Sequence, residues 1–160
     1  MQNRYLALQR RALSGGESLK TNDEVKDMSD GEKILRKLIE PYKGKLVLVD
    51  VWGTWCSPCR QALSHSKELY ERMAQYDIVF LYLANRSDDE SWKNVIKEYE
   101  VTGDNVVHYN LPNEQQSAVE NFLKVNQYPT YRLIDRNGNL LDVNADPRNL
   151  DALENFLKAL

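Results

Sequence analysis

Apolar residues along the chain alternate between continuous runs and helical spacing. Two runs, 46–52 and 78–83, are almost wholly apolar and rich in β-branched residues, and Asp50 is their one polar residue. Runs of this kind are typical of strands buried on both faces in a central parallel sheet. Two shorter strands are predicted over 106–109 and 130–134.

Apolar residues spaced three and four apart predict helices between these strands. The predicted helices cover 29–40, 56–73, 88–100, 115–125 and 146–160. The first begins with a capping-box sequence, Ser29 to Glu32, and ends before Pro41. The last begins at Asp146 and Pro147.

The C-terminal third carries a signal for a β-hairpin. Asn137-Gly138 lies between the strand 130–134 and a further apolar run, 140–143. Strands that alternate with helices and end in a hairpin and a helix predict an α/β sandwich. We therefore expect a mixed central sheet with helices on both faces, in which the hairpin supplies the antiparallel part.

Residues 1–28 differ in pattern from the rest of the chain. Ser14-Gly15-Gly16 interrupts a short apolar pattern, and the stretch 20–27 is polar, as in a linker. We predict an N-terminal extension or linker over 1–28 and a folded domain over 29–160. The alternative is a long ordered arm.

The composition narrows the class of protein. Of 160 residues, 42% are hydrophobic and 28% charged, which is typical of a soluble globular domain. A net charge of -3 gives no basic surface for nucleic acid. No apolar stretch approaches the ~18 residues that a membrane span needs. The N-terminus lacks the apolar core of a signal peptide, so we expect either that none exists or that it has been removed.

The chemistry of the chain centres on its two cysteines, Cys56 and Cys59. A disulfide-stapled secreted domain would carry more cysteines, in bridges that close longer loops. Cys56 begins the predicted helix 56–73, where free N–H groups and the helix dipole favour a thiolate. Cys59 lies one turn further on and is expected to be covered, and Pro58 suits a first helical turn. We assign Cys56 as an exposed nucleophile and Cys59 as the resolving thiol.

Other uses of the cysteine pair fit the sequence less well. Zinc needs four ligands, and only His65 and His108 could join the two cysteines; by helical phase His65 points away from them. A peroxidase needs a lone activated cysteine with a threonine and a proline upstream, and no such run occurs. Two idle cysteines are hard to reconcile with a buried strand that leads directly into the pair.

The run from Asp50 to Arg60, together with Tyr128-Pro129-Thr130, resembles thioredoxin. Trp-Gly-Thr-Trp-Cys-x-Pro-Cys is more closely similar to the extracytoplasmic TlpA/ResA-type branch of that superfamily. The resemblance covers roughly 43–160. It implies a thioredoxin-like three-layer sandwich, with an extra helix and strand inserted between 88 and 111.

The resemblance also implies site residues and partners. Pro129 should be cis and face the cysteines, and the substrate-binding residues should be Trp55, Ser57, Pro58, Tyr128 and Pro129. It implies a redox-active Cys56–Cys59 disulfide and no further cofactor. We expect no bound metal and no nucleic-acid partner. The implied partners are protein thiols or disulfides, an upstream electron-donor protein, and an upstream domain or membrane anchor. The implied location is extracytoplasmic, in the periplasm or envelope.

Three positions depart from the ResA-type pattern. Ala62 stands where an acidic residue is common, Asp50 where Asn is frequent, and Ser64 where a helix-kinking proline is usual. We expect a straighter helix, and a buried Asp50 with a raised pKa that accepts the Cys59 proton. The alternative is a strand-end Asp50 that reaches solvent.

Together these features predict a thiol–disulfide oxidoreductase that exchanges disulfides with protein substrates through its Cys-Ser-Pro-Cys dithiol. The proline before the second cysteine resembles the reducing members of the superfamily, which favours a reductant. The alternative is a thioredoxin-fold interaction module with incidental redox activity.

Overall fold

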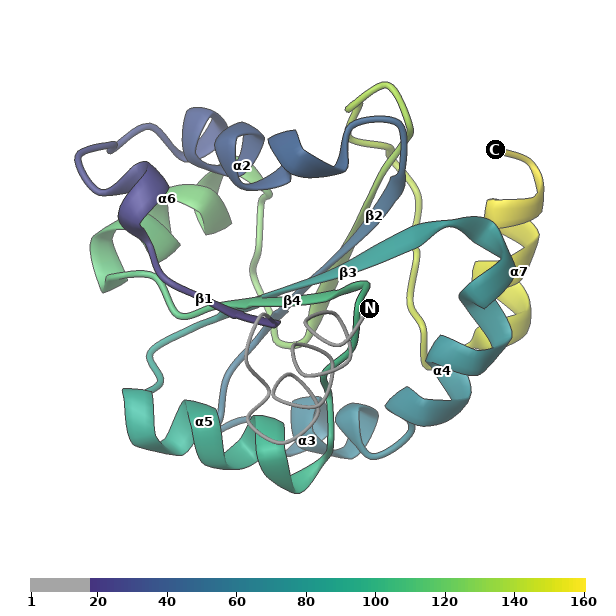
Figure 1. Cartoon of the computed structure of the whole chain (residues 1–160), viewed down its shortest axis with the longest axis horizontal. Helices are drawn as coiled ribbons and strands as arrows, with labels where there is room; N and C mark the ends of the chain where they lie inside the picture. Colours follow the sequence, from purple (N-terminus) through teal and green to yellow (C-terminus); the bar gives the residue numbers. More distant parts are fainter. Residues whose placement is uncertain (1–17) are drawn as a thin grey trace, which may run out of the picture.

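The computed structural model describes residues 18–160, and a five-stranded sheet of order β1-β4-β3-β2-β5 lies at its centre (Figure 1). The strands are β1 (Leu19–Lys20), β2 (Leu46–Trp52), β3 (Ile78–Ala84), β4 (Val106–Tyr109) and β5 (Thr130–Ile134). Strands β1 to β4 run parallel to one another, and β5 runs antiparallel to β2. The predicted α/β fold with a mixed sheet is confirmed.

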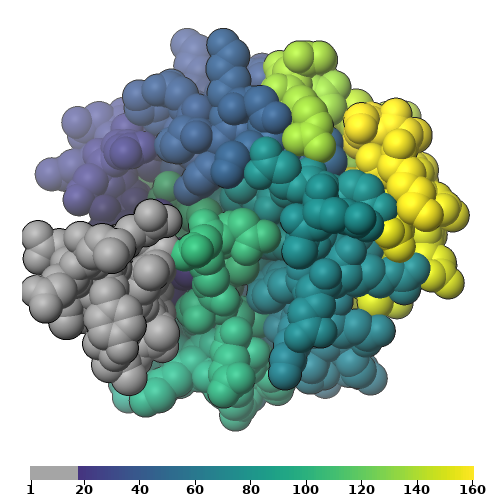
Figure 2. Space-filling view, turned by 45° about the vertical axis from the view of Figure 1, so that its right-hand side comes forward, coloured from purple at the N-terminus to yellow at the C-terminus, as the bar shows by residue number. Residues whose placement is uncertain are grey.

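Helices cover both faces of this sheet (Figure 1). One face carries α2 (Gly31–Ile39) and α6 (Asn113–Phe122), and the other carries α3 (Ser57–Leu63), α4 (Ser66–Met73), α5 (Asp89–Glu98) and α7 (Leu150–Lys158). Short 3-10 turns, η2 (Asp23–Val25), η3 (Glu40–Tyr42) and η4 (Ala74–Tyr76), join or flank these elements. The space-filling view shows α7 in yellow against the blue-green surface of α4 (Figure 2).

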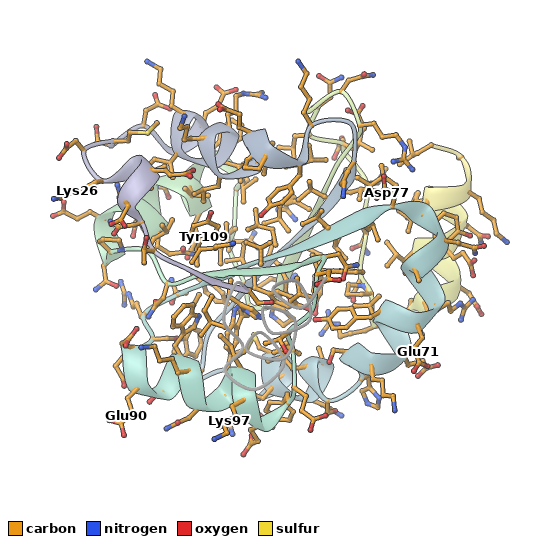
Figure 3. All side chains as sticks on the ribbon, in the orientation of Figure 1. Lys26, Glu71, Asp77, Glu90, Lys97 and Tyr109 are labelled. Atoms are coloured by element: carbon orange, nitrogen blue, oxygen red, sulfur yellow. A yellow bond between two sulfur atoms is a disulfide. The ribbon has the colours of Figure 1, made fainter. Side chains whose placement is uncertain are left out.

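The two central strands divide the core into two halves. Every residue of β2 and β3 is buried. Leu46 and Leu48 pack into the cluster beneath α3, α4, α5 and α7, whereas Val47 and Val49 pack into the cluster beneath α2 and α6. This alternation follows from the two-residue period of a strand. Charged side chains such as Glu71, Glu90 and Lys97 lie at the periphery, while Tyr109 lies inside (Figure 3).

The expectation of one straighter helix over 56–73 is wrong, because the chain breaks into α3 and α4 at Ser64 and His65. The Ser64 hydroxyl donates to the Gln61 carbonyl at 2.5 Å, and the His65 N–H donates to the Ala62 carbonyl at 3.1 Å. Serine side chains that bond to nearby backbone compete with helical hydrogen bonding. Ser64 therefore interrupts the helix without a proline.

The C-terminal part also differs from its prediction. After β5, one isolated bridge joins Ile134 to Leu140, and no further strand forms there among the described residues. The helix expected from Asp146 begins only at Leu150, where the Asn149 side chain accepts from the Ala152 N–H at 3.1 Å. The residues between the bridge and α7 are therefore irregular, and they carry the Asp146–Arg148 ion pair.

The predicted boundary at residue 28 does not match the packing of the described residues 18–28. Leu19 of β1 pairs with His108 of β4, and Val25 is 0% exposed in the cluster beneath α2 and α6. The Gln115 side chain donates to the Val25 carbonyl at 2.6 Å. The polar composition of this segment gave no sign that it packs against the domain. A single buried valine and backbone hydrogen bonds hold it there. Residues 1–17, the rest of the predicted extension, lie outside the described residues.

Replacing Val25 with alanine should destabilise the whole domain. Loss of two buried methyl groups costs about 2 kcal/mol, as transfer free energy plus the cavity left behind. We expect that loss in guanidinium denaturation of the oxidised protein. Lys26→Ala, at the exposed neighbouring position, should change stability by no more than about 0.5 kcal/mol. An unchanged Val25→Ala midpoint would mean that this segment is not part of the cooperative unit.

Within the described part of the chain, no helix is both long and apolar enough to cross a membrane.

Candidate active site

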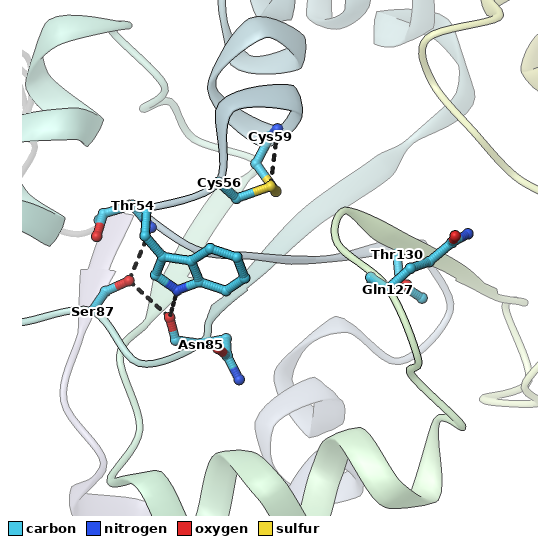
Figure 4. Close-up of a disulfide and its surroundings, with 8 residues drawn as sticks. Thr54, Cys56, Cys59, Asn85, Ser87, Gln127 and Thr130 are labelled. Atoms are coloured by element: carbon cyan, nitrogen blue, oxygen red, sulfur yellow. Dashed lines mark hydrogen bonds between the residues drawn. A yellow bond between two sulfur atoms is a disulfide. The ribbon is translucent and has the colours of Figure 1, made fainter.

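The two cysteines lie at the start of α3, shortly after the end of β2. Cys56 has extended backbone angles and is the N-cap of α3, and its Sγ accepts a hydrogen bond from the Cys59 N–H at 3.3 Å. Pro58 occupies the first turn of α3, where a missing N–H leaves no bond unmade. Cys56 and Cys59 form a disulfide with their Cα atoms 5.2 Å apart (Figure 4).

The exposure expected for Cys56 is not observed in this disulfide-bonded form. Cys56 is 4% exposed and Cys59 is 2% exposed. The disulfide directs both side chains toward each other rather than outward. The exposed residues around the pair are Trp55, at 55%, together with Ser57 and Pro58.

Hydrogen bonds fix the loop that carries Trp55. The indole Nε1 donates to the Asn85 carbonyl at 2.9 Å, and the Thr54 N–H donates to the Ser87 hydroxyl at 3.0 Å (Figure 4). A Cβ at Gly53 would lie 2.4 Å from the Trp55 Nε1. Glycine is therefore required at that position for the indole to fold back toward β3.

The loop before β5 reaches the same site. The peptide bond between Tyr128 and Pro129 is cis, and Pro129 is buried. The Tyr128 ring meets the Trp55 indole edge to face, with centroids 5.2 Å apart. The Thr130 hydroxyl donates to the Gln127 carbonyl at 2.6 Å and closes the turn (Figure 4). The structure thus brings Tyr128 and Trp55 together, from positions far apart in the sequence.

Glu120 of α6 joins these two loops, and the sequence analysis did not identify it. Its carboxylate accepts from the Tyr128 hydroxyl, from the Asn85 amide at 2.9 Å and from the Gln116 amide at 2.8 Å. Burial and the bond to Glu120 raise the pKa of Tyr128 to about 12. The one signal in the sequence was a polar pair, Gln116 and Glu120, four apart on the inner face of a helix.

Asp50 is buried, so the alternative of a carboxyl that reaches solvent from the strand end is wrong. It is 8% exposed, and its Oδ1 has no hydrogen-bond partner among the described residues. It lies directly opposite Tyr82 of β3 and Tyr131 of β5 in the strand register. Burial raises the pKa of Asp50 to about 8, while the nearby Arg148 lowers it and Asp146 raises it. Asp50 is therefore largely protonated at neutral pH.

A cavity of about 670 Å³ opens beside Asp50. Its walls come from α3, α4, the central strands and the residues at the start of α7, including Pro58, Ala62, His65, Tyr131 and Arg148. Ala62 lines this space with its small side chain.

The two histidines lie apart from the cysteines. His65 is exposed at the break between α3 and α4. His108 is buried in β4, where its Nε2 lies 2.6 Å from the Val101 carbonyl. Within residues 18–160, no group of three or more His, Cys, Asp or Glu side chains is placed to hold a metal ion.

The cysteine pair lies at the N-terminus of a helix, directly after a central strand, and a Tyr-Pro loop reaches the same site. This arrangement defines a thiol–disulfide oxidoreductase of the thioredoxin fold. The model of the thioredoxin-like family matches residues 44–140, and the chain belongs to this family.

Similar proteins agree with this class. The thiol-disulfide oxidoreductase ResA of Bacillus thuringiensis is 27% identical over 131 residues, which cover 82% of this chain and 70% of that protein. The thioredoxin domain of a thiol-disulfide oxidoreductase from Bacteroides vulgatus superposes with a TM-score of 0.62 at 23% identity, over 74% of this chain and 84% of that one. An exposed lipoprotein thioredoxin from Streptococcus pneumoniae superposes with a TM-score of 0.59 at 25% identity, over 76% of this chain and 90% of that one.

Proposed function

We propose that this oxidoreductase reduces disulfides in protein substrates, with Cys56 as the nucleophile and Cys59 as the resolving thiol. The observation that carries the proposal is the placement of Cys56 as the N-cap of α3, with Cys59 one turn behind it in bonding distance. The Cys56 thiolate attacks a substrate disulfide and forms a mixed disulfide. Cys59 then attacks the Cys56 sulfur, so that the intramolecular disulfide forms and the substrate leaves as a thiol.

Asp50 is the proposed proton acceptor in the second step. Cys59 must lose its proton before it attacks, and Asp50 is the carboxyl buried in the strand that precedes the dithiol. A raised pKa near the working pH suits a group that takes and returns a proton.

The proposed substrate-docking surface consists of Trp55, Ser57, Pro58, Tyr128 and Pro129. The first three are the exposed residues around the disulfide. The Trp55–Tyr128 contact and the shared anchoring to Asn85 hold the two loops in register. Such a surface presents aromatic area and free backbone to an extended substrate chain, a mode in which main-chain contacts give affinity.

The proposed setting is extracytoplasmic, with protein thiols or disulfides as substrates and a separate electron-donor protein that reduces Cys56–Cys59 again. The name of one similar protein, an exposed lipoprotein thioredoxin, supports this setting. No cofactor beyond the disulfide is required for the exchange, because both electrons reside in the dithiol.

A reducing direction predicts a low reduction potential. Both cysteines are buried, so desolvation disfavours a thiolate, and weak thiolate stabilisation favours the disulfide form. We expect a potential near that of thioredoxin, about -270 mV, rather than near that of DsbA, about -120 mV. Equilibration with dithiothreitol redox buffers, read by thiol trapping, measures it. A potential above that of the glutathione pool, about -220 mV, would contradict the reducing role.

A further inference from the structure

A closed set of hydrogen bonds lies beneath the aromatic residues that border the disulfide. The Tyr128 hydroxyl donates to Glu120 Oε1, while the Asn85 side-chain amide donates to Glu120 Oε2 at 2.9 Å and to the Tyr128 oxygen at 3.1 Å. The Gln116 amide donates to the same Oε2 at 2.8 Å. Both amide hydrogens of Asn85 and the hydroxyl hydrogen of Tyr128 are therefore used within this set.

Asn85 connects this set to Trp55. The Asn85 carbonyl accepts from the Trp55 Nε1 at 2.9 Å (Figure 4), and the Asn85 N–H donates to the Trp52 carbonyl at 2.7 Å. The Trp55 ring meets the Tyr128 ring edge to face, with centroids 5.2 Å apart. The polar atoms of both rings are thus held by two buried residues, Asn85 and Glu120, so neither ring is free to turn on its own.

Glu120 is a buried carboxylate that neutral donors hold. It is 7% exposed, and within residues 18–160 its partners are one hydroxyl and two amides. The packing of α6 does not depend on it, because apolar residues such as Val119, which is 0% exposed, fill the core there. Burying a carboxylate costs free energy, which indicates that its acceptor atoms are needed. Its two oxygens accept only, whereas a glutamine would direct an NH2 group at one of the three donors.

We propose that Glu120 is a positioning residue for substrate docking, which holds the Tyr128 and Trp55 rings as a preformed platform beside the disulfide. It acts through the Tyr128 hydroxyl and the Asn85 amide and does not touch the reacting sulfur atoms. This inference rests on the proposed function, because it concerns the docking surface for a protein substrate. Side chains that are immobilised in advance need not be ordered when a chain binds, which is worth about tenfold in affinity. A small disulfide without a peptide chain gains nothing from such a platform.

Two substrates of different size separate this role from a general loss of structure. The reduced protein is mixed either with insulin, which brings a peptide chain, or with hydroxyethyl disulfide, which has none, and quenched-flow thiol trapping gives the rate constant for each. Glu120→Gln should lower the rate constant for insulin about tenfold and leave that for hydroxyethyl disulfide unchanged. Glu114→Gln, an exposed position on the same helix, should keep both rate constants. Nitrogen-15 NMR should show faster solvent exchange of the Trp55 indole N–H in Glu120→Gln.

Tyr128→Phe provides a second variant, which keeps the ring and removes the hydroxyl that Glu120 holds. It should show the same selective loss with insulin, and the double variant Glu120→Gln/Tyr128→Phe should lose less than the two single losses combined, because the carboxylate acts through that hydroxyl. It also carries the test alone if Glu120→Gln does not fold.

Equal losses with insulin and hydroxyethyl disulfide, or an unchanged rate constant with insulin, would overturn the positioning role and leave the proposed function intact. A wild-type protein that fails to reduce insulin would overturn both. The substrate-selective loss is therefore the result that supports Glu120 as a positioning residue.

Discussion

Cys59→Ser should abolish catalysed insulin reduction and accumulate a covalent complex with the substrate. Without the resolving thiol, the Cys56 sulfur still attacks the substrate disulfide, but nothing within the protein displaces the product. The mixed disulfide is then released only by external thiol, so turnover with dithiothreitol should fall to near the uncatalysed rate. Non-reducing electrophoresis and intact-mass spectrometry should detect one substrate chain per protein, removable by excess dithiothreitol.

Cys56→Ser provides the matched comparison. It should lose turnover to the same extent but trap far less substrate, since Cys59 lies one turn inside α3, away from the helix end that favours a thiolate. The double variant Cys56→Ser/Cys59→Ser should trap nothing. Equal trapping by the two single variants would contradict the assigned roles. Absence of catalysed insulin reduction in the wild-type protein would instead favour an interaction module whose redox activity is incidental.

The elements predicted correctly are those whose own sequence of apolar residues indicates that they are buried. β2 and β3 are apolar over their whole length, so burial on both faces follows from composition alone. Asp50 could be identified because it is a single charge in such a strand. The position of Cys56 followed from the strand before it and from Pro58, which suits a first helical turn.

The features missed depend on interactions that act across the chain. The break at Ser64 arises from one hydroxyl that bonds Gln61, which competes with a helical pattern that otherwise continues. Glu120 belongs to the site because the fold brings Asn85 and Tyr128 to its carboxylate, and these residues lie 35 and 8 positions away in the sequence. Val25 is one apolar residue in a polar stretch, and its burial comes from the helices that cover it. Periodicity does not report such contacts.

Asp50→Asn should stabilise the oxidised protein at neutral pH. The unfolded chain ionises Asp50 near pH 3.9, whereas burial raises the folded-state pKa to about 8. Between those values the folded state holds more protons than the unfolded state, so the free energy of unfolding falls as pH rises through this window and levels off above it. At about 1.4 kcal/mol per pKa unit, the penalty reaches roughly 4 kcal/mol by pH 7. Asparagine does not ionise and so avoids this penalty. The cost of burying its amide reduces the gain in stability.

The pH dependence distinguishes this effect from general repacking. Urea denaturation of oxidised wild-type and Asp50→Asn proteins from pH 4 to pH 9 should show the stability difference changing by about 5 kcal/mol in favour of the variant between pH 4 and pH 8, so that the variant is the more stable protein at pH 8. Asp142→Asn, at an exposed position, should follow the wild-type curve. A constant offset at every pH, or a variant less stable at pH 8, would show that Asp50 is not an acid held protonated by burial.

The same variant should slow one chemical step and spare the other. Removal of the proton acceptor leaves the Cys59 thiol protonated, so release of the mixed disulfide should fall by about 10²-fold or more, the usual contribution of a positioned general base. The first attack by Cys56 does not pass a proton to Asp50 and should change far less. Stopped-flow mixing with a disulfide peptide resolves the two phases, and a release phase as fast as in the wild-type protein would remove Asp50 from the mechanism.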